Sequence, residues 1–338
     1  MLVRTRSLLS ISLVALLGLL AAGGVFAQSA PATVQNSQQA MELLERAQQA
    51  AKTLNYHGTF AHQRDGQMYA FRVTHRYHEG QEQERLEVLS SSPREYLRID
   101  DHVQGVIPQQ KLIITERQQH KRFPALLMDD GHQLGEYYEV VAPERQSWVA
   151  GRACQPLSIL PKDKHRIRYE LCIDDRTGLL LEAQTRDADG AVLEHMAFHQ
   201  VQIGQAISDE QLRAAWAVQD WPVVNRELTT IDFRALGWFY REPPGYRAVS
   251  ELERQFRHNR TVQQVILTDG LATISIFIEP YRPDLSHHQM TGAKRSGAIN
   301  LFGKRYGAYW VMVAGEAPAP TVKNLAQSIV KTGVLHNR

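Results

Sequence analysis

The chain has 338 residues, with 38 lysines and arginines against 36 aspartates and glutamates, so its formal net charge is +2. Such a balance gives no electrostatic basis for a general affinity for nucleic acid. The length exceeds one comfortable hydrophobic core and favours two domains.

The first 27 residues are predicted to be a secretory signal peptide. Arg4 and Arg6 precede an apolar run at residues 8–20, and a small-residue site follows at residues 25–27. The apolar run is shorter than the roughly 20 residues of a membrane span, and no cysteine stands at the cleavage site to carry a lipid. We therefore expect a soluble exported protein that begins near Gln28.

The two halves of the mature chain are oppositely charged. Residues 28–225 hold 21 lysines and arginines against 27 acidic residues, whereas residues 226–338 hold 15 against 9. The contrast fits two solvated surfaces that happen to differ, or a basic module for an anionic partner or for the acidic half itself. The candidate residues for an anionic partner are Arg247, Arg254, Arg257, Arg260, Lys294, Arg295, Lys304 and Arg305.

The mature chain is predicted to begin with a helix at residues 37–54, where Ser37 is the N-cap and apolar residues recur at helical spacing. A hairpin on Asp65-Gly66 follows, and a two-residue turn there pairs Phe60 with Phe71 and His62 with Tyr69. Strand-like runs continue at residues 85–89, 94–100, 103–107 and 111–115. These patterns indicate an antiparallel sheet.

Between residues 118 and 143 the alternation stops, which favours a short helix or loop that covers one face of the sheet. A face with many apolar side chains and few helices to cover it is either an ordinary core or a cavity for an apolar ligand. The candidate cavity residues are Phe60, Tyr69, Phe71, Leu97, Ile99, Leu126 and Met128.

Residues 148–203 give the strongest pattern, which is that of a four-stranded antiparallel meander. In the second run Ile167, Tyr169 and Leu171 alternate with charged residues, as in a half-buried strand. The three turns, at residues 161–165, 174–178 and 187–190, are rich in residues that tolerate tight backbone.

The only two cysteines, Cys154 and Cys172, fall in the first hairpin of this meander. A five-residue loop centred on Asp163 would place them directly opposite each other, and an exported compartment permits a disulfide. A register slip of one residue would instead leave two unpaired thiols.

The remaining predicted elements are a brief helix at the end of the first domain, a linker and a second domain. A capping box at Ser208 predicts a brief helix to Trp216, and residues 220–232 are expected to be the linker. The second domain is expected to hold a hairpin on Asp269-Gly270 that aligns Val265 with Ile274, another strand pair at residues 298–302 and 308–314, and a final helix. Thr321 is the expected cap of that helix, and Val322, Leu325 and Ile329 form its apolar stripe.

No catalytic constellation is recognisable, although the chain has 14 histidines. His195 and His199 are four residues apart on a strand and so roughly 13 Å apart, too far to share a metal ion. Nucleophile-elbow and phosphate-loop motifs do not occur. The sequence therefore favours a binding protein that has no catalytic residues, no metal and no cofactor.

Several segments together resemble the RseB/MucB family of periplasmic regulators of envelope-stress sigma factors. They are residues 148–152, 161–163 with Arg166, 169–171, 177–179, 54–60, 269–271 with 275–277, and 313–316. The resemblance implies an α+β fold with two domains. The first, at residues 28–219, would be an unclosed antiparallel β-barrel with covering helices, similar to the lipoprotein carriers; the second, at residues 233–338, would be a smaller α/β domain.

The resemblance also implies a function in the periplasm. The protein would bind the periplasmic segment of a membrane anti-sigma factor similar to RseA or MucA, shield it from the initiating protease, and be released by lipid or lipopolysaccharide. A lipid or lipoprotein carrier without a regulatory role is the alternative, but the basic second domain would then be unexplained. Assembly into a homo-oligomer stays open.

Overall fold

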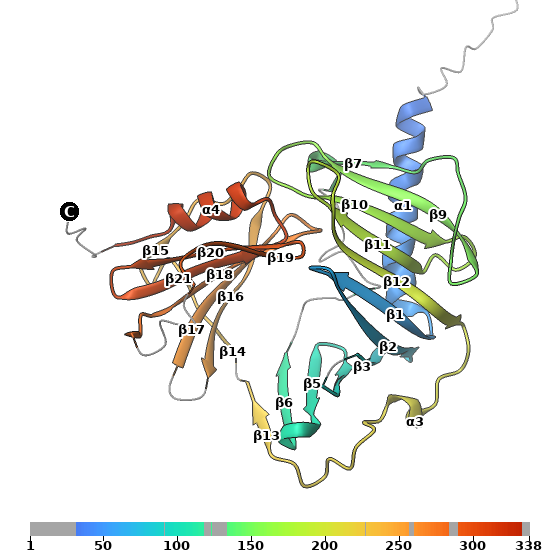
Figure 1. Ribbon diagram of the computed structural model, residues 1–338, viewed down its shortest axis with the longest axis horizontal. Coiled ribbons are helices and arrows are strands. Elements are labelled where there is room, and N and C mark those ends of the chain that lie inside the picture. Colours follow the sequence, from blue (N-terminus) through green and yellow to red (C-terminus); the bar gives the residue numbers. More distant parts are fainter. Residues whose placement is uncertain are drawn as a thin grey trace, which may run out of the picture.

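The computed structural model describes residues 32–90, 92–117, 123, 134–226, 228–256, 260–283 and 290–332. The predicted signal peptide, Leu126, Met128 and Arg257 lie outside these ranges. Figure 1 shows two twisted sheets side by side, with one long helix against the N-terminal sheet and a shorter helix against the C-terminal sheet. The α+β class and the two-part layout are as expected. No described helix is long and apolar enough to cross a membrane.

The N-terminal sheet is open and, in the described part of the chain, has thirteen strands in the order β13-β6-β5-β4-β3-β2-β1-β12-β11-β10-β9-β7, with β8 paired to β9. Its strands are β1 (Tyr56–Arg64), β2 (Gln67–His78), β3 (Gln81–Val88), β4 (Arg94–Ile99), β5 (His102–Ile107), β6 (Leu112–Arg117), β7 (Tyr138–Val141), β8 (Ser147–Val149), β9 (Arg152–Pro161), β10 (Arg168–Asp174), β11 (Leu180–Arg186), β12 (Val192–Ile203) and β13 (Val223–Asn225). Neighbouring strands are antiparallel except β13 and β6, which are parallel.

The first hairpin has the predicted register. Phe60 pairs with Phe71 and His62 with Tyr69, because Asp65 and Gly66 both adopt the positive φ angles of a two-residue turn, 51° and 74°. Helix α1 (Ala32–Thr53) covers this part of the sheet and begins before the predicted cap. Its apolar stripe, with Ala40, Leu44 and Ala47, is buried in the same core as Phe60.

The hairpin of β9 and β10 differs from its predicted register by two residues. Leu171 lies opposite Leu157, and Cys172 opposite Pro156 rather than Cys154. A shift of two residues keeps every side chain on its predicted face, so the cysteines remain close and form a disulfide with their Cα atoms 5.5 Å apart.

Two predicted segments are shorter or more ordered than expected. The described end of the predicted covering segment is a one-turn helix, α2 (Leu134–Tyr137), followed directly by β7. Tyr138 and Val140 of β7 are buried. Helix α3 (Asp209–Leu212) has the predicted capping box at Ser208 but ends four residues before Trp216.

The C-terminal sheet has seven strands among the described residues, in the order β14-β16-β17-β18-β21-β20-β19. They are β14 (Leu228–Thr230), β16 (Arg247–Phe256), β17 (Arg260–Thr268), β18 (Thr273–Pro280), β19 (Gly292–Ser296), β20 (Ile299–Tyr306) and β21 (Tyr309–Gly315). A short ladder of β15 (Trp238–Phe239) and β22 (Val330–Lys331) lies beside it.

Helix α4 (Ala319–Ser328) packs on this sheet through Val322 and Leu325, and Ile329 just after it is also buried, as the stripe predicts. Its N-cap is Pro318, so the predicted cap Thr321 is instead a buried residue of the first turn.

The hairpin on Asp269-Gly270 also differs from prediction by two residues. Val265 pairs with Ile276, and Leu267 with Ile274. The loop is longer than two residues because Oδ1 of Asp269 accepts hydrogen bonds from the backbone N–H groups of Leu271 and Ala272. Such an Asx-type turn is a common use of aspartate.

The predicted linker is partly built into both sheets. Strand β13 lies on the edge of β6, and β14 lies on the edge of β16. The segment between the domains therefore has no long free stretch among its described residues.

Candidate functional site

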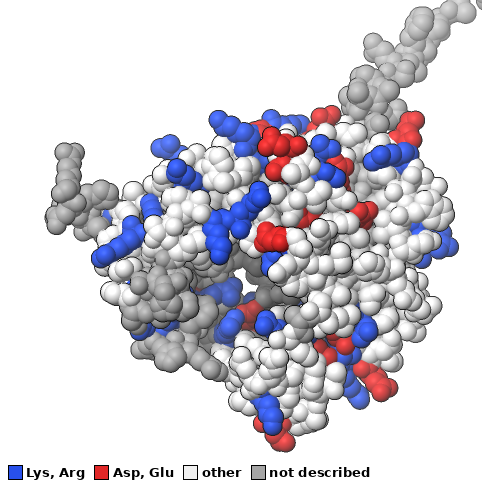
Figure 2. Space-filling model, in the orientation of Figure 1, with Lys and Arg blue, Asp and Glu red and all other residues white. Residues whose placement is uncertain are grey.

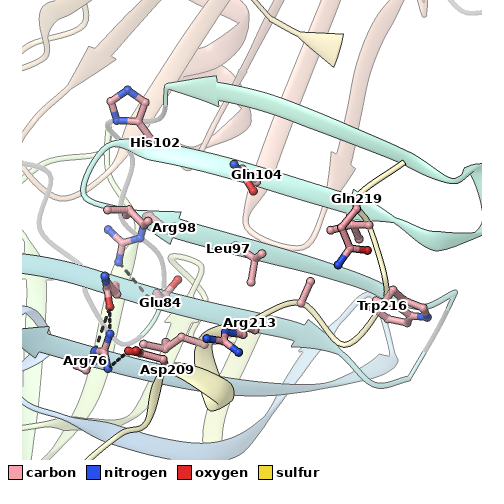
Figure 3. A pocket seen from close by; sticks show the side chains of 15 residues that line it. Arg76, Glu84, Leu97, Arg98, His102, Gln104, Asp209, Arg213, Trp216 and Gln219 are labelled. Atoms are coloured by element: carbon pink, nitrogen blue, oxygen red, sulfur yellow. Dashed lines mark hydrogen bonds and ion pairs between the residues drawn. The ribbon is translucent and has the colours of Figure 1, made fainter. Parts of the chain in front are cut away.

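A cleft of about 580 Å³ lies on one face of the N-terminal sheet, beneath residues 209–219, which we call the strap. Leu97 and Ile99 of β4 and Gln104 of β5 form its floor, and Leu212 and Trp216 of the strap lie above them. Figure 3 shows Leu97 directed toward the strap and Arg213 and Trp216 on the opposite side. The cleft can hold a small apolar group next to hydrogen-bonding amides.

The strap is held by charged side chains at its beginning. Arg76 forms an ion pair with Asp209 at 2.7 Å, and the strap's Ala215 N–H donates to the Glu95 carboxylate at 3.1 Å. Glu95 is buried and is neutralised by Arg85 at 2.6 Å. These contacts fix the strap to β2, β3 and β4 and leave the apolar floor of the cleft partly open.

The two domains meet where the loops of two hairpins touch. Arg166, in the loop after β9, has a fully buried side chain that forms ion pairs with Asp163 and with Asp269 of the C-terminal domain, the latter at 2.9 Å. Arg166 also donates to the carbonyl of Pro244 at 2.7 Å. Tyr138 donates its hydroxyl hydrogen to Asp269 at 2.9 Å. The buried charges are therefore paired, as stable burial requires.

Aromatic rings surround this pair. The guanidinium carbon of Arg166 lies 4.3 Å from the ring centroid of Tyr137 and 5.2 Å from that of Tyr246, distances at which a cation is attracted to the ring face. Burial raises the pKa values of Tyr138 and Tyr246 far above the ordinary range. Both phenols stay neutral: Tyr138 is a hydrogen-bond donor to Asp269, and Tyr246 packs its ring against the guanidinium.

A carboxylate beside this pair carries an altered pKa. Glu316 follows β21 and is partly buried, and its Oε2 lies 3.5 Å from the hydroxyl of Tyr169 in β10. Burial raises the pKa of Glu316 to about 7, and repulsion from Glu194 and Asp269 adds to the increase. Burial thus favours the protonated form of Glu316 more than it does for an exposed carboxyl group.

A second contact joins the first hairpin to the turn between β19 and β20. Asp65 accepts hydrogen bonds from Gly297 N–H at 2.8 Å and from Ser296 Oγ at 2.9 Å, while Glu194 accepts one from Ala298 N–H at 3.1 Å. Gly297 has a positive φ of 56°, and a Cβ atom there would clash with Glu194 and Arg64. Glycine is required at this close approach.

A third contact joins the sheet edges. Glu116 of β6 lies 3.6 Å from Arg226 of the linker and 3.5 Å from Arg254 of β16. Arg254 is thus directed to the other domain, and its burial lowers its pKa. Figure 2 shows a hollow between the two domains, with acidic and basic side chains at its margin.

The predicted cavity residues do not share one face, and this part of the prediction is wrong. Phe71 pairs with Val88, whereas Leu97 pairs with Arg85, which faces the other side of β3. Leu97 and Ile99 consequently line the cleft under the strap. Phe60, Tyr69 and Phe71 remain together on the opposite face.

The face that carries Phe60 is packed with aromatic rings in the described part of the chain. The ring centroid of Phe60 lies 5.1 Å from Phe71, 5.1 Å from Phe123 and 5.9 Å from Phe198. Phe123, in the predicted covering segment, is buried. Phe123 therefore packs on the aromatic face beside Phe60 and Phe198.

The predicted basic residues do not form a single surface. Arg247, Arg254 and Arg260 lie on β16 and β17, near one edge of the C-terminal sheet, whereas Lys294, Arg295, Lys304 and Arg305 lie on β19 and β20 at the other edge. Arg260 pairs with Glu279 at 2.5 Å, and Arg305 stacks on Tyr281 at 4.2 Å. Lys294 and Arg295 are exposed.

Comparison with known proteins assigns the chain to a family. The family description "MucB/RseB N-terminal domain" matches residues 39–216, and "MucB/RseB C-terminal domain" matches residues 233–330. The chain belongs to the MucB/RseB family. It is 31% identical over 303 residues to the Pseudomonas aeruginosa protein named "Sigma factor AlgU regulatory protein MucB", which covers 86% of this chain and 90% of that protein. A Haemophilus influenzae "Sigma-E factor regulatory protein RseB" is 24% identical over 86% of this chain and 90% of its own length.

Solved MucB structures have a similar fold. MucB in complex with MucA(peri) superposes with a TM-score of 0.65 at 27% identity, over 87% of this chain and all of that one. The MucA/MucB complex of Pseudomonas aeruginosa gives a TM-score of 0.68 at 26% identity, over 88% of this chain and all of that one. The similarity extends through both domains of this MucB/RseB chain.

Three of the described histidines of this family member have ordinary structural partners. His195 lies 2.7 Å from Glu182, and His62 lies 3.0 Å from Glu194. His75 is fully buried, stacks on Tyr56 and contacts the carbonyl of Leu54 at 2.8 Å. Within the described residues, no group of three His, Cys, Asp or Glu side chains could hold a metal ion.

Sequence reasoning missed the residues that join the domains of this MucB/RseB chain. Arg166 and Asp269 each stand in a loop with ordinary turn composition, 103 positions apart. The pattern gave no signal, because Arg166 stands in phase with the charged positions of the alternation, Arg168 and Glu170, and such positions are expected to face solvent.

Proposed function

We propose that this protein is a negative regulator of an envelope-stress sigma factor. It binds the periplasmic segment of a membrane anti-sigma factor and shields that segment from proteolysis. The observation that supports this proposal is the similarity, through both domains, to MucB in its complex with MucA(peri). The chemistry required is binding, and the protein acts without a catalytic residue or a cofactor.

The site of action is the periplasm. The amino-terminal charge and hydrophobicity pattern of an export signal supports this location, as does a disulfide between the two cysteines. Lipid or lipopolysaccharide releases the anti-sigma segment. Exposed Lys294 and Arg295, at the edge of the C-terminal sheet, attract acidic groups of the partner or phosphates of the lipid.

The decisive experiment is a calorimetric titration of the mature protein with the periplasmic segment of the anti-sigma factor encoded in the same genome. We expect saturable binding, and we expect the bound segment to resist the initiating protease. Heat changes no larger than those of dilution, together with unchanged proteolysis, would refute the proposed function.

Charge variants test the basic edge. The double charge reversal Lys294→Glu and Arg295→Glu should weaken binding, and added salt should reduce the difference from the unmodified protein because both side chains are exposed. Arg260→Glu is the matched control, since Arg260 already has Glu279 as its partner. If the double variant and Arg260→Glu weaken binding of the segment equally, the edge at β19 does not take part in the proposed contact.

Titrations repeated with lipopolysaccharide, or with neutral phospholipid vesicles, test release. Competition by lipopolysaccharide supports the lipid signal, and simultaneous binding of lipid and segment without mutual weakening contradicts it.

A further inference from the structure

A pocket of about 340 Å³ lies at the second interdomain contact, where the first hairpin meets the turn between β19 and β20. Residues of β1, β11, β12 and the hairpin turn line it from the N-terminal domain, and β19 with its turn lines it from the C-terminal domain. Its volume lies within the range of small-molecule sites. The polar side chains of the lining are Gln63, Arg64, Asp65, Gln184, His195 and Arg295.

Two arginines, one from each domain, contribute to this pocket. Arg64 is the last residue of β1, and Arg295 lies on β19. Neither guanidinium forms a hydrogen bond or an ion pair with another described residue. The stem of Arg64 packs against Gly297, since a Cβ atom there would lie 2.5 Å from its Cγ and 2.7 Å from its Cδ. The pocket therefore has unused charged donors from both domains, and packing positions one of them.

A row of neutral polar side chains forms the N-terminal wall. Gln63, His195 and Gln184 are direct cross-strand partners on β1, β12 and β11, so they face the same side of the sheet. Glu182 holds two of them: it lies 2.7 Å from Nε2 of His195 and accepts a hydrogen bond from Gln184 at 2.9 Å. The amide of Gln63 has no hydrogen bond within the described part of the chain, so it adds a third unused donor.

The acidic residue of the lining, Asp65, already has donors. Its carboxylate accepts hydrogen bonds from Gly297 N–H at 2.8 Å and from Ser296 Oγ at 2.9 Å. Glu194, which lies near Gly297, is outside the lining and also has contacts from both domains. Two arginines and one aspartate leave the pocket with a net positive charge when its histidine is neutral. The pocket thus favours an anion.

The arrangement of the donors indicates which anion fits. Arg64 and Gln63 reach the pocket from one domain and Arg295 from the other. A phosphoryl group has oxygens in several directions and can accept from both sides, whereas a carboxylate has two oxygens in one plane. Guanidinium groups also match the geometry and charge of phosphoryl oxygens.

We propose that this pocket binds a phosphoryl group that bridges the two domains. Arg64 and Gln63 bind its oxygens from the N-terminal domain, and Arg295 binds them from the C-terminal domain. The ligand ties the first hairpin to the turn after β19 and strengthens the contact made by Asp65. This inference goes beyond the proposed binding of the anti-sigma segment, because it concerns a small ligand. It also requires Arg295 but not Lys294, which lies outside the lining and on the opposite face of β19.

A titration of the mature protein with inorganic phosphate, without the anti-sigma segment and at constant ionic strength, tests the site. Phosphate should raise the Tm in a saturable manner. It should also increase the hydrogen-exchange protection of Gly297 N–H and Ala298 N–H, which donate across the junction. Chloride at the same ionic strength should do neither. A Tm and a protection that phosphate leaves unchanged would overturn the site, and this outcome would leave the binding of the segment untouched.

Neighbouring substitutions on β19 locate the binding. Arg295→Gln should weaken phosphate binding about tenfold, which corresponds to about 1.4 kcal/mol, because it removes a charged donor. Lys294→Gln is the matched control: it removes the same charge from the next exposed residue of the strand, and the affinity should stay within about twofold. Arg64→Gln should weaken binding from the other domain. If Arg295→Gln and Lys294→Gln bind phosphate equally, the site is overturned.

Two further ligands identify the source of the phosphoryl group. Glucose 1-phosphate is a soluble phosphomonoester, and vesicles of phosphatidylcholine with phosphatidic acid present the same group on a membrane surface. The ligand that reproduces the protection of Gly297 and Ala298 is the source, and protection by inorganic phosphate alone assigns the free ion. Vesicles of phosphatidylcholine alone are the control. Protection that persists undiminished in Arg295→Gln at the same ligand concentrations would overturn the site.

Discussion

The contact at Arg166 and the contact at Glu116 both join the two domains through charged side chains, but they differ in burial and geometry. Arg166 and Asp269 have fully buried side chains 2.9 Å apart, with Tyr138 as an additional donor. Glu116 and Arg254 are 3.5 Å apart, and Arg254 keeps 20% of its side-chain surface exposed. Since an uncompensated buried charge is far more costly than a solvated one, the first contact should control interdomain stability and the second should adjust it.

The largest expected effect comes from removing the buried cation. Arg166→Ala leaves Asp269 without its ion-pair partner and should lower the free energy of unfolding by about 3–5 kcal/mol. Urea denaturation followed by tryptophan fluorescence measures the loss. The double variant Arg166→Met with Asp269→Asn removes both charges, while the amide oxygen at position 269 can still accept the hydrogen bonds from Leu271 and Ala272. Its free energy of unfolding should therefore be higher than that of Arg166→Ala. If Arg166→Ala lowers the free energy of unfolding by no more than Arg254→Ala does, burial does not distinguish the two contacts.

Removing the disulfide tests the support of the Arg166 loop. The bridge spans 18 positions and joins the two strands that lead to this loop. Replacing both cysteines by alanine should cost about 3 kcal/mol through the greater freedom of the unfolded chain, without loss of the fold. Thiol titration of denatured, non-reduced protein should detect no free thiol. Two free thiols per chain would contradict the bridge, and a stability unchanged by the double replacement would contradict its role.

The pH dependence of unfolding provides a smaller, separable effect. The raised pKa of Glu316 stabilises the folded state below the ordinary carboxyl range, and this contribution declines as the pH rises toward about 7 and is constant above it. Between pH 4 and pH 8 the free energy of unfolding of the unmodified protein should fall by on the order of 2 kcal/mol more than that of Glu316→Gln. The difference is smaller than for a fully buried carboxyl group because Glu316 retains some contact with solvent. Parallel profiles would contradict the assignment of this titration to Glu316.

The smallest effect is expected at the edge contact. Arg254→Ala should lower the free energy of unfolding by about 1 kcal/mol or less, and high salt should reduce the difference. Arg226→Ala, at a similar distance from Glu116, is the companion variant. A loss comparable to that of Arg166→Ala would place the main interdomain contact at the sheet edges.

The sequence predicted which strands form, but not how all of them align. Alternation identifies the two faces of each strand, and Asp65-Gly66 sets the register of the first hairpin because its turn is local. The hairpins at Arg166 and Asp269 are each shifted by two residues. Both of these loops contribute to the same interdomain ion pair, a long-range interaction that no local pattern contains.

The sequence also did not predict which candidate site residues lie together on one face of a sheet. Phe71, Leu97 and Ile99 were grouped on one face, yet the two-residue connection at Glu79 and Gly80 pairs odd with even positions between β2 and β3, whereas β3 and β4 pair odd with odd positions. Leu97 and Ile99 therefore face the strap, away from Phe71. The group of basic residues was separated for a comparable reason, because strand order within the C-terminal sheet cannot be derived from spacing alone.

The placement of β13 and β14 also bears on aggregation. An uncovered sheet edge presents free N–H and carbonyl groups that can recruit another chain, and these two short strands occupy the edges of β6 and β16. The segment that connects the domains thus shields one edge of each sheet from edge-to-edge association. Proteolytic nicking of this segment would expose both edges at once, and the nicked protein would then be prone to assemble into intermolecular β-structure even while each sheet kept its own fold.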